Sequence, residues 1–144
     1  MEEKPTTNFP RPELLKLLCI LTFIGSGLSM LSNVALFALI DQVRGMFAEN
    51  QTYTLFGVEM DMSVFLQVNP LFFMVQAVLF SLSFLGALQM WKLNKIGFHI
   101  YSIAQISLLI VPKLFIPGMP FPVLDLVLTG SFIYFYYLNV KFMH

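Results

Sequence analysis

The 144-residue sequence has little charge. Aspartate, glutamate, lysine and arginine make up 11% of the chain, whereas average globular proteins carry roughly 25%. Hydrophobic residues make up 58%, and the mean hydropathy is +0.79. Because so few charges cannot cover a water-exposed surface, we expect lipid to surround most of the chain. Acidic and basic residues are equal in number and no basic cluster occurs, which argues against nucleic-acid binding.

Cysteine and histidine are also scarce. The single cysteine, Cys19, excludes an intrachain disulfide and a metal cluster held by several thiolates. The two histidines, His99 and His144, are too few for a multi-histidine metal site. The sequence contains no glycine-rich phosphate loop, no zinc-protease motif and no nucleophile elbow. We therefore expect a protein that is not an enzyme, with no catalytic residue, no metal site and no cofactor.

Long apolar runs are what the sequence has in abundance. A helix of about 20 apolar residues crosses the hydrocarbon core, and four runs reach or approach that length: residues 14–40, 70–91, 96–111 and 123–140. Continuous runs argue against a transmembrane barrel, whose strands alternate in hydrophobicity. The predicted fold is therefore an all-α, four-helix transmembrane bundle that forms a single domain over residues 1–144.

The connections between these runs predict an antiparallel, up-and-down arrangement. Residues 92–95 (KLNK) are so few that the second and third helices must form a hairpin. Residues 112–122 hold four prolines and one glycine, which predicts a turn and ends the third helix near Pro112. Residues 41–69 form the one long loop.

The basic residues predict how this bundle is oriented. In a four-span bundle both termini and the 92–95 turn share one side of the membrane. Six of the eight basic residues lie on that side: Lys4, Arg11, Lys16, Lys92, Lys95 and Lys141. Only Arg44 and Lys113 lie on the other. The positive-inside rule then places both termini in the cytoplasm and the 41–69 loop outside, as in a protein of the bacterial inner membrane.

Two shorter patterns concern the membrane interfaces. Amphipathic aromatic rings favour such interfaces, and four aromatic residues are expected at the cytoplasmic one: Trp91, Tyr134, Tyr136 and Tyr137. Residues 58–68 alternate between apolar and mostly polar side chains. This alternation favours a short strand, although an interfacial segment that leads into the second span explains the same residues.

Small and polar residues follow one face of the first predicted helix. Thr22, Ser26 and Ser29 lie at positions i, i+4 and i+7, with Gly25 beside them. Small residues four apart let membrane helices approach closely. The pattern predicts a helix-packing seam, and its functional alternative is the wall of a polar pathway.

Counting from the helix ends places a group of polar residues at similar depth near the outer side. Asn33, Gln76 and Asp125 lie in the outer third of three different helices, and Lys113 lies at the rim. Polar side chains in spans turn away from lipid, so these four residues are the candidate ligand-binding site for a small polar or cationic molecule. The alternative is that Asp125 pairs with Lys113 or stabilises the start of its own helix, where a carboxylate meets the positive end of the helix dipole.

Two segments resemble a group of small bacterial membrane proteins with four predicted spans. They are RPELLKLLCILTFIGSG (11–27) and MWKLNKIGFHIYSIAQ (90–105). The resemblance implies a four-span bundle; the group has no assigned activity, so it transfers no functional residue. Small multidrug transporters also have four spans, but they carry an essential glutamate in the first span. Here the first span has no acidic residue between Glu13 and Asp41, which argues against their proton-coupled antiport.

Two functions fit these observations. The first is a small accessory or scaffold protein that acts through helix–helix contacts in the bilayer, as a homo-oligomer or within a larger membrane complex. The alternative is a homo-oligomeric transporter, or a ligand-binding membrane protein, that uses the outward-facing polar site.

Overall fold

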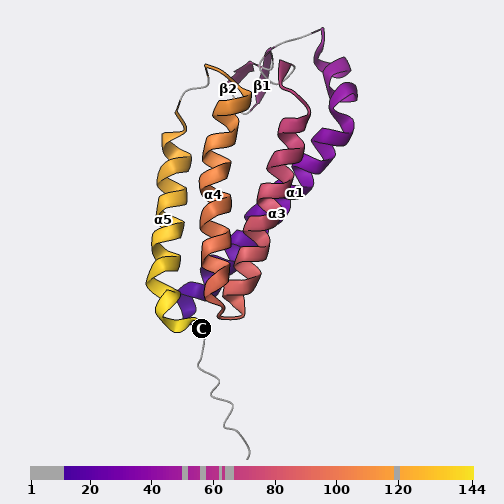
Figure 1. Cartoon of the computed structure of the whole chain (residues 1–144). Coiled ribbons are helices and arrows are strands. Elements are labelled where there is room, and N and C mark those ends of the chain that lie inside the picture. Colours follow the sequence, from indigo (N-terminus) through magenta and orange to yellow (C-terminus); the bar gives the residue numbers. More distant parts are fainter. Residues whose placement is uncertain (1–11, 50–51, 56–57, 62, 64–66, 119–120) are drawn as a thin grey trace, which may run out of the picture.

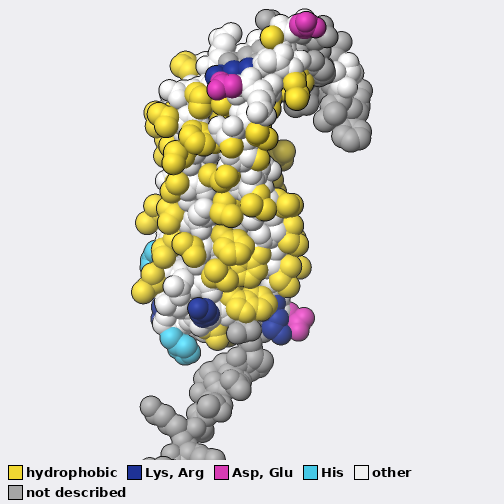
Figure 2. Space-filling model, turned by 90° about the vertical axis from the view of Figure 1, so that its right-hand side faces the viewer, with side chains coloured by type: hydrophobic (Ala, Val, Ile, Leu, Met, Phe, Trp, Pro, Cys, Tyr) yellow, Lys and Arg dark blue, Asp and Glu magenta, His cyan; other side chains and the backbone are white. Residues whose placement is uncertain are grey.

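Four long helices dominate the computed structural model, which describes residues 12–49, 52–55, 58–61, 63, 67–118 and 121–144. Figure 1 shows them: α1 (Glu13–Phe47), α3 (Leu71–Trp91), α4 (Lys95–Phe115) and α5 (Val123–Asn139), which continues into a short 3₁₀ helix, η1 (Val140–Phe142). Each is long and apolar enough to cross a membrane, as the sequence predicts. Figure 2 shows hydrophobic side chains over the middle of the face in view and charged side chains towards its two ends.

The first helix is longer than its apolar run. It continues past Ile40 to Phe47, so residues 41–47 are helical rather than part of a loop. Ile40 is buried against Val68 and Phe73, and the Arg44 guanidinium donates a hydrogen bond to the Val68 carbonyl at 2.5 Å. These contacts extend the helix because they hold it against the chain that enters α3, which hydropathy alone does not reveal.

The third spanning helix, α4, also passes the expected end. Pro112 lies inside it and the helix ends at Phe115. A proline removes one backbone N–H, but the Pro112 carbonyl still accepts a hydrogen bond from the Ile116 N–H at 2.9 Å. The turn is therefore shorter than residues 112–122.

A small β-hairpin follows α1. β1 (Thr52–Leu55) and β2 (Val58–Asp61) pair antiparallel, with Thr52 opposite Asp61 and Leu55 opposite Val58. The strand favoured by the alternation over 58–68 is thus present in its first four residues. Most of 62–66 lies outside the described residues. In Figure 1 the hairpin lies at the end of the bundle where α3 and α5 begin and α4 ends; we call this the strand end.

The opposite end, which we call the turn end, is where residues 92–94 connect α3 to α4. Leu93 adopts the left-handed region with φ 61°, and the Asn94 side chain accepts a hydrogen bond from the Ile96 N–H, which caps α4. The last residue pairs with this turn. His144 donates its N–H to the Leu93 carbonyl at 2.7 Å and accepts from the Lys95 N–H at 3.0 Å.

Two glycines let α3 and α4 touch through their backbones. A Cβ built on Gly86 would lie 2.8 Å from the Tyr101 nitrogen, and one built on Gly97 would lie 2.5 Å from the Gly86 carbonyl oxygen. Only glycine fits at such a distance. This pair therefore makes a direct backbone contact between α3 and α4, whereas a Cβ on Gly25 of the predicted seam would meet nothing within 4 Å.

The main hydrophobic core lies towards the turn end. It combines residues of α1, α3, α4, α5 and the segment after η1: Leu15, Leu18, Cys19, Ala87, Met90, Tyr101, Tyr136 and Met143. Tyr136 is fully buried here between the helices, and its expected depth near the membrane interface stays a prediction. Tyr134 and Tyr137, its neighbours on α5, are exposed.

The helix α5 is packed at one end only. Its buried residues are Tyr136 and Asn139, both near the turn end. All six residues from Val123 to Leu128 are exposed. The half of α5 that begins at the strand end therefore stands away from the rest of the bundle.

Candidate functional site

A cavity of about 350 Å³ lies where α5 stands away, and we call it the Asp125 cavity. Residues of α3, α4 and α5 and Pro122, which precedes α5, line it: Gln76, Phe80, Gln105, Leu108, Leu109, Pro112, Lys113, Pro122, Asp125, Leu128 and Thr129. Most of the wall is apolar, with a few polar groups placed in it. This is the usual composition of a small-molecule site.

Asp125 occupies the first turn of α5. It is the third residue after Pro122, and no side chain caps this helix start. The unpaired N–H groups of a first turn favour a nearby carboxylate, by about 0.3–1 kcal/mol when it is exposed. Asp125 is exposed and also lines the cavity, so its place at the helix start and its place in the cavity wall are compatible.

Lys113 comes from the last turn of α4 and lines the same cavity. Its Nζ atom lies 4.3 Å from the centre of the Phe121 ring. Among the described residues, Arg44 and Asp41 form an ion pair at 3.8 Å, and no ion pair involves Lys113 or Asp125. Lys113 and Asp125 therefore share a cavity with opposite charges but do not form an ion pair with each other.

Gln76 supplies a polar group that lacks a partner. Its side chain is buried, with 7% of the residue exposed, and its Oε1 atom makes no hydrogen bond to any described residue. A buried amide oxygen without a partner costs about 1–3 kcal/mol. Gln76 also lines the Asp125 cavity, but its Oε1 atom has almost no exposed surface, so a molecule in the cavity would contact other atoms of this side chain.

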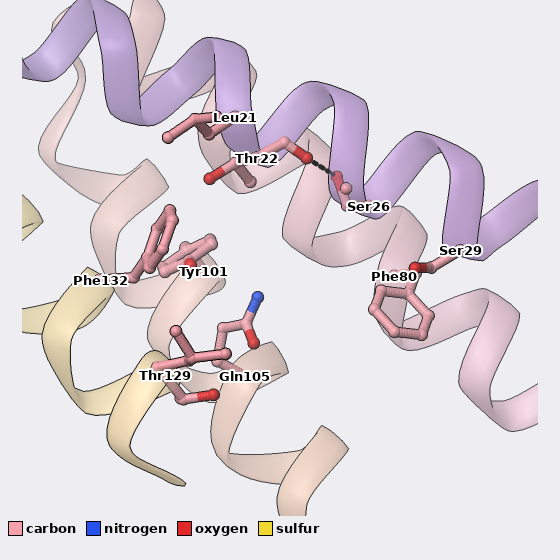
Figure 3. A pocket seen from close by; sticks show the side chains of 11 residues that line it. Leu21, Thr22, Ser26, Ser29, Phe80, Tyr101, Gln105, Thr129 and Phe132 are labelled. Atoms are coloured by element: carbon pink, nitrogen blue, oxygen red, sulfur yellow. Dashed lines mark hydrogen bonds between the residues drawn. The ribbon is translucent and has the colours of Figure 1, made fainter. Parts of the chain in front are cut away.

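A second cavity of about 240 Å³, which we call the Thr22 cavity, continues from the first. Phe80, Gln105, Leu128 and Thr129 line both. Figure 3 shows Thr22, Ser26 and Ser29 of α1 across from Tyr101 and Gln105 of α4 and Thr129 and Phe132 of α5. The two cavities form one groove along the inner face of α5.

Towards the turn end, the Thr22 and Tyr136 hydroxyls are 2.8 Å apart and link α1 to α5. Along the groove wall, Ser26 donates to the Thr22 carbonyl of its own helix, and Gln105 Nε2 donates to the buried Ser83 hydroxyl at 3.0 Å. The main core, which includes Cys19 and Tyr136, lies beyond Thr22 towards the turn end. The groove is therefore closed at its floor by packed side chains, and its charged groups lie near the strand end.

The structure brings together three of the four residues proposed as a ligand site. Gln76, Lys113 and Asp125 line one cavity. Asn33 lines neither cavity; its side-chain amide donates to the Ser29 carbonyl of its own helix at 2.8 Å. Figure 1 shows α1 crossing the bundle obliquely, with its C-terminal end on the side away from α5.

The small-residue stripe of α1 lies at the groove. Thr22 makes a hydrogen bond to α5, while Gly25, Ser26 and Ser29 line the Thr22 cavity with it. Sequence reasoning did not select Gln105 or Thr129 as site residues, nor the glycine pair that joins α3 to α4. Within the described ranges no group of three histidine, cysteine, aspartate or glutamate residues is placed to hold a metal ion.

Comparison of the chain with protein-family models, with curated proteins and with solved structures finds no match. The function is therefore argued from the geometry of the groove.

Proposed function

We propose that the protein is an integral membrane protein that binds a small amphipathic molecule in the groove beside α5. The observation that carries this proposal is a mostly apolar cavity whose wall holds the Asp125 carboxylate and the Lys113 ammonium group, which form no ion pair with each other. A few charged groups placed in an apolar wall are typical of a small-molecule site. A bound molecule with a polar head would contact these groups.

The apolar share of the wall supports an amphipathic ligand. Phe80, Leu108 and Leu128 line the cavity between the polar groups, and the outer surface of α5 is apolar and exposed. A molecule with a polar head and an apolar tail can satisfy both parts of the wall.

A tryptophan in place of Leu128 tests this proposal, because Leu128 lines both cavities and the larger ring would fill the groove. The full chain is purified in mild detergent and examined by native mass spectrometry. The wild-type protein is expected to retain a non-covalent molecule that Leu128→Trp loses. Leu124→Trp is the matched control, because Leu124 is on the same helix, is 73% exposed and lines neither cavity. A wild-type protein that retains nothing, or equal retention in all three proteins, would contradict the proposal.

The accessory or scaffold function is a second candidate, and the exposed half of α5 favours it. The residues from Val123 to Leu128 are exposed around the whole helix, which leaves an apolar surface for another membrane helix. Cross-linking of Leu124→Cys in native membranes tests whether that helix belongs to a second copy of the chain. A cross-linked dimer supports homo-oligomerisation, and its absence at every reagent length argues against it.

We also infer an antiparallel arrangement across the bilayer, with both termini in the cytoplasm of a bacterial cell and the protein in its inner membrane. The uneven distribution of basic residues supports this orientation. Lys92, Lys95 and Lys141 belong to the turn end, together with Lys16 near the start of α1, whereas Arg44 and Lys113 belong to the strand end.

A further inference from the structure

The charges of the Asp125 cavity narrow the class of its ligand. A simple cation would be attracted by Asp125 but repelled by Lys113. A simple anion would be attracted by Lys113 but repelled by Asp125. The two groups line one cavity without pairing with each other. A ligand with both a positive and a negative group matches both residues at once, which is the usual form of electrostatic complementarity in recognition.

The hydrogen-bonding groups narrow the class further. The Asp125 carboxylate is an acceptor only, and it forms no ion pair with any described residue. A primary ammonium group has three N–H donors and can donate hydrogen bonds to a carboxylate as well as neutralise its charge. A quaternary ammonium group has no N–H, so it would supply the charge alone. The cavity therefore favours a primary amine over a trimethylated one.

The position of the cavity indicates where the ligand comes from. Lys113 and Asp125 lie in the last turn of α4 and the first turn of α5, at the ends of two spanning helices, where lipid headgroups meet the hydrocarbon. From there the apolar side chains of Leu108 and Leu128 lead into the groove. A headgroup between the helix ends and an acyl chain along these residues would occupy the whole groove.

From these three observations we propose that the groove binds a phospholipid whose headgroup carries a primary ammonium and a phosphate, as in phosphatidylethanolamine. Asp125 accepts hydrogen bonds from the ammonium, and Lys113 neutralises the phosphate. The proposal rests on the function proposed above and specifies its ligand.

The test measures which lipid the protein prefers. The full chain in detergent is titrated with dioleoyl phosphatidylethanolamine, phosphatidylcholine and phosphatidylglycerol, and lipid-bound species are quantified by native mass spectrometry. We expect phosphatidylethanolamine to bind about tenfold more tightly than phosphatidylcholine, because only its ammonium group can donate charge-assisted hydrogen bonds to the carboxylate. Equal binding of these two lipids, or tighter binding of phosphatidylglycerol, would overturn the proposal.

Substitutions identify the groups that make this preference. Asp125→Asn should reduce the preference for phosphatidylethanolamine about tenfold, and Lys113→Gln should weaken both zwitterionic lipids together. Asp41→Asn is the matched control, because Asp41 is paired with Arg44 on α1 and lines neither cavity. A preference for phosphatidylethanolamine that survives Asp125→Asn contradicts the assigned contact.

A third comparison separates the lipid from its free headgroup. Glycerophosphoethanolamine has the same two charged groups but no acyl chain. We expect it to compete at least a hundredfold more weakly than the lipid; competition at equal concentration would show a water-soluble zwitterion as the ligand and overturn the lipid assignment. Loss of a retained molecule in Leu128→Trp together with no lipid preference would leave the groove function intact and contradict this inference alone.

Discussion

Alanine at Gly86 or Gly97 is expected to destabilise the protein, because these residues bring the backbones of α3 and α4 into contact. The new methyl group at position 97 would lie 2.5 Å from the Gly86 carbonyl oxygen and 2.6 Å from the Met90 nitrogen. Both are backbone atoms, so no side-chain rotation relieves the overlap and the two helices must move apart.

The magnitude follows from two opposing terms. Forcing an extra methyl group into a packed interface costs about 1–3 kcal/mol, and the upper end of this range applies because the obstacle is backbone. Alanine is favoured over glycine inside a helix by about 1 kcal/mol, which offsets part of the cost. The free energy of unfolding should therefore fall by about 2 kcal/mol for Gly97→Ala, and by somewhat less for Gly86→Ala, whose nearest contact is 2.8 Å.

The measurement is reversible unfolding in mixed micelles, followed by far-ultraviolet circular dichroism. Gly25→Ala and Gly130→Ala are the controls, since a Cβ at either position meets nothing within 4 Å, and both should stabilise the protein slightly through helix propensity. The double variant Gly86→Ala/Gly97→Ala should lose less than the sum of the single losses, because one separation of the helices relieves both contacts. If Gly97→Ala is as stable as Gly25→Ala, the proposed backbone contact is wrong.

Three further predictions concern other contacts. A double-mutant cycle of Thr22→Val and Tyr136→Phe should give a coupling energy of about 0.6 kcal/mol, and at most about 1.7 kcal/mol, in the same unfolding assay; a coupling of zero would argue against the hydrogen bond between α1 and α5. Arg44→Met removes the donor to the Val68 carbonyl, so hydrogen exchange should become faster at Phe72 and Phe73 while the middle of α3 stays protected; unchanged exchange at both amides would refute this link. With both termini in the cytoplasm, a membrane-impermeant thiol reagent should label Glu49→Cys in intact cells and Lys141→Cys only after permeabilisation, and the reverse pattern would invert the orientation.

The sequence predicted the four helices because hydropathy reports directly on what surrounds a helix. It did not predict where α1 and α4 end. Residues 41–47 are polar enough to read as a loop, and their helical state depends on Arg44 and Ile40 contacting the distant Val68. At Pro112 the rule that proline breaks helices placed the end three residues early, because a proline near a helix end removes only one hydrogen bond.

The candidate site was partly predictable for a related reason. Depth along a helix can be counted from its ends, and this count grouped Gln76, Lys113 and Asp125, which line one cavity. The direction in which a helix diverges cannot be counted, so Asn33 was included although it lines neither the Asp125 cavity nor the Thr22 cavity. In a membrane protein the lipid-facing and buried surfaces are both apolar, and the sequence therefore gave no sign that Gly86 and Gly97 meet while Gly25 faces a cavity.

The one-sided attachment of α5 gives the groove a mechanical property. Tyr136, Met143 and the backbone pairing of His144 with Leu93 fix this helix at the turn end, and its opposite half has no buried side chain. Val123 lies 13 residues before Tyr136, which makes an arm of roughly 20 Å, so the helix would act as a lever with its pivot beside Tyr136. A rotation of about 10° at that pivot would displace the far tip by roughly 3 Å for an arm of this length. Small rearrangements of the core around Tyr136 are thereby magnified into opening or closing at Asp125, and a molecule bound there is in turn coupled to the packing of the core.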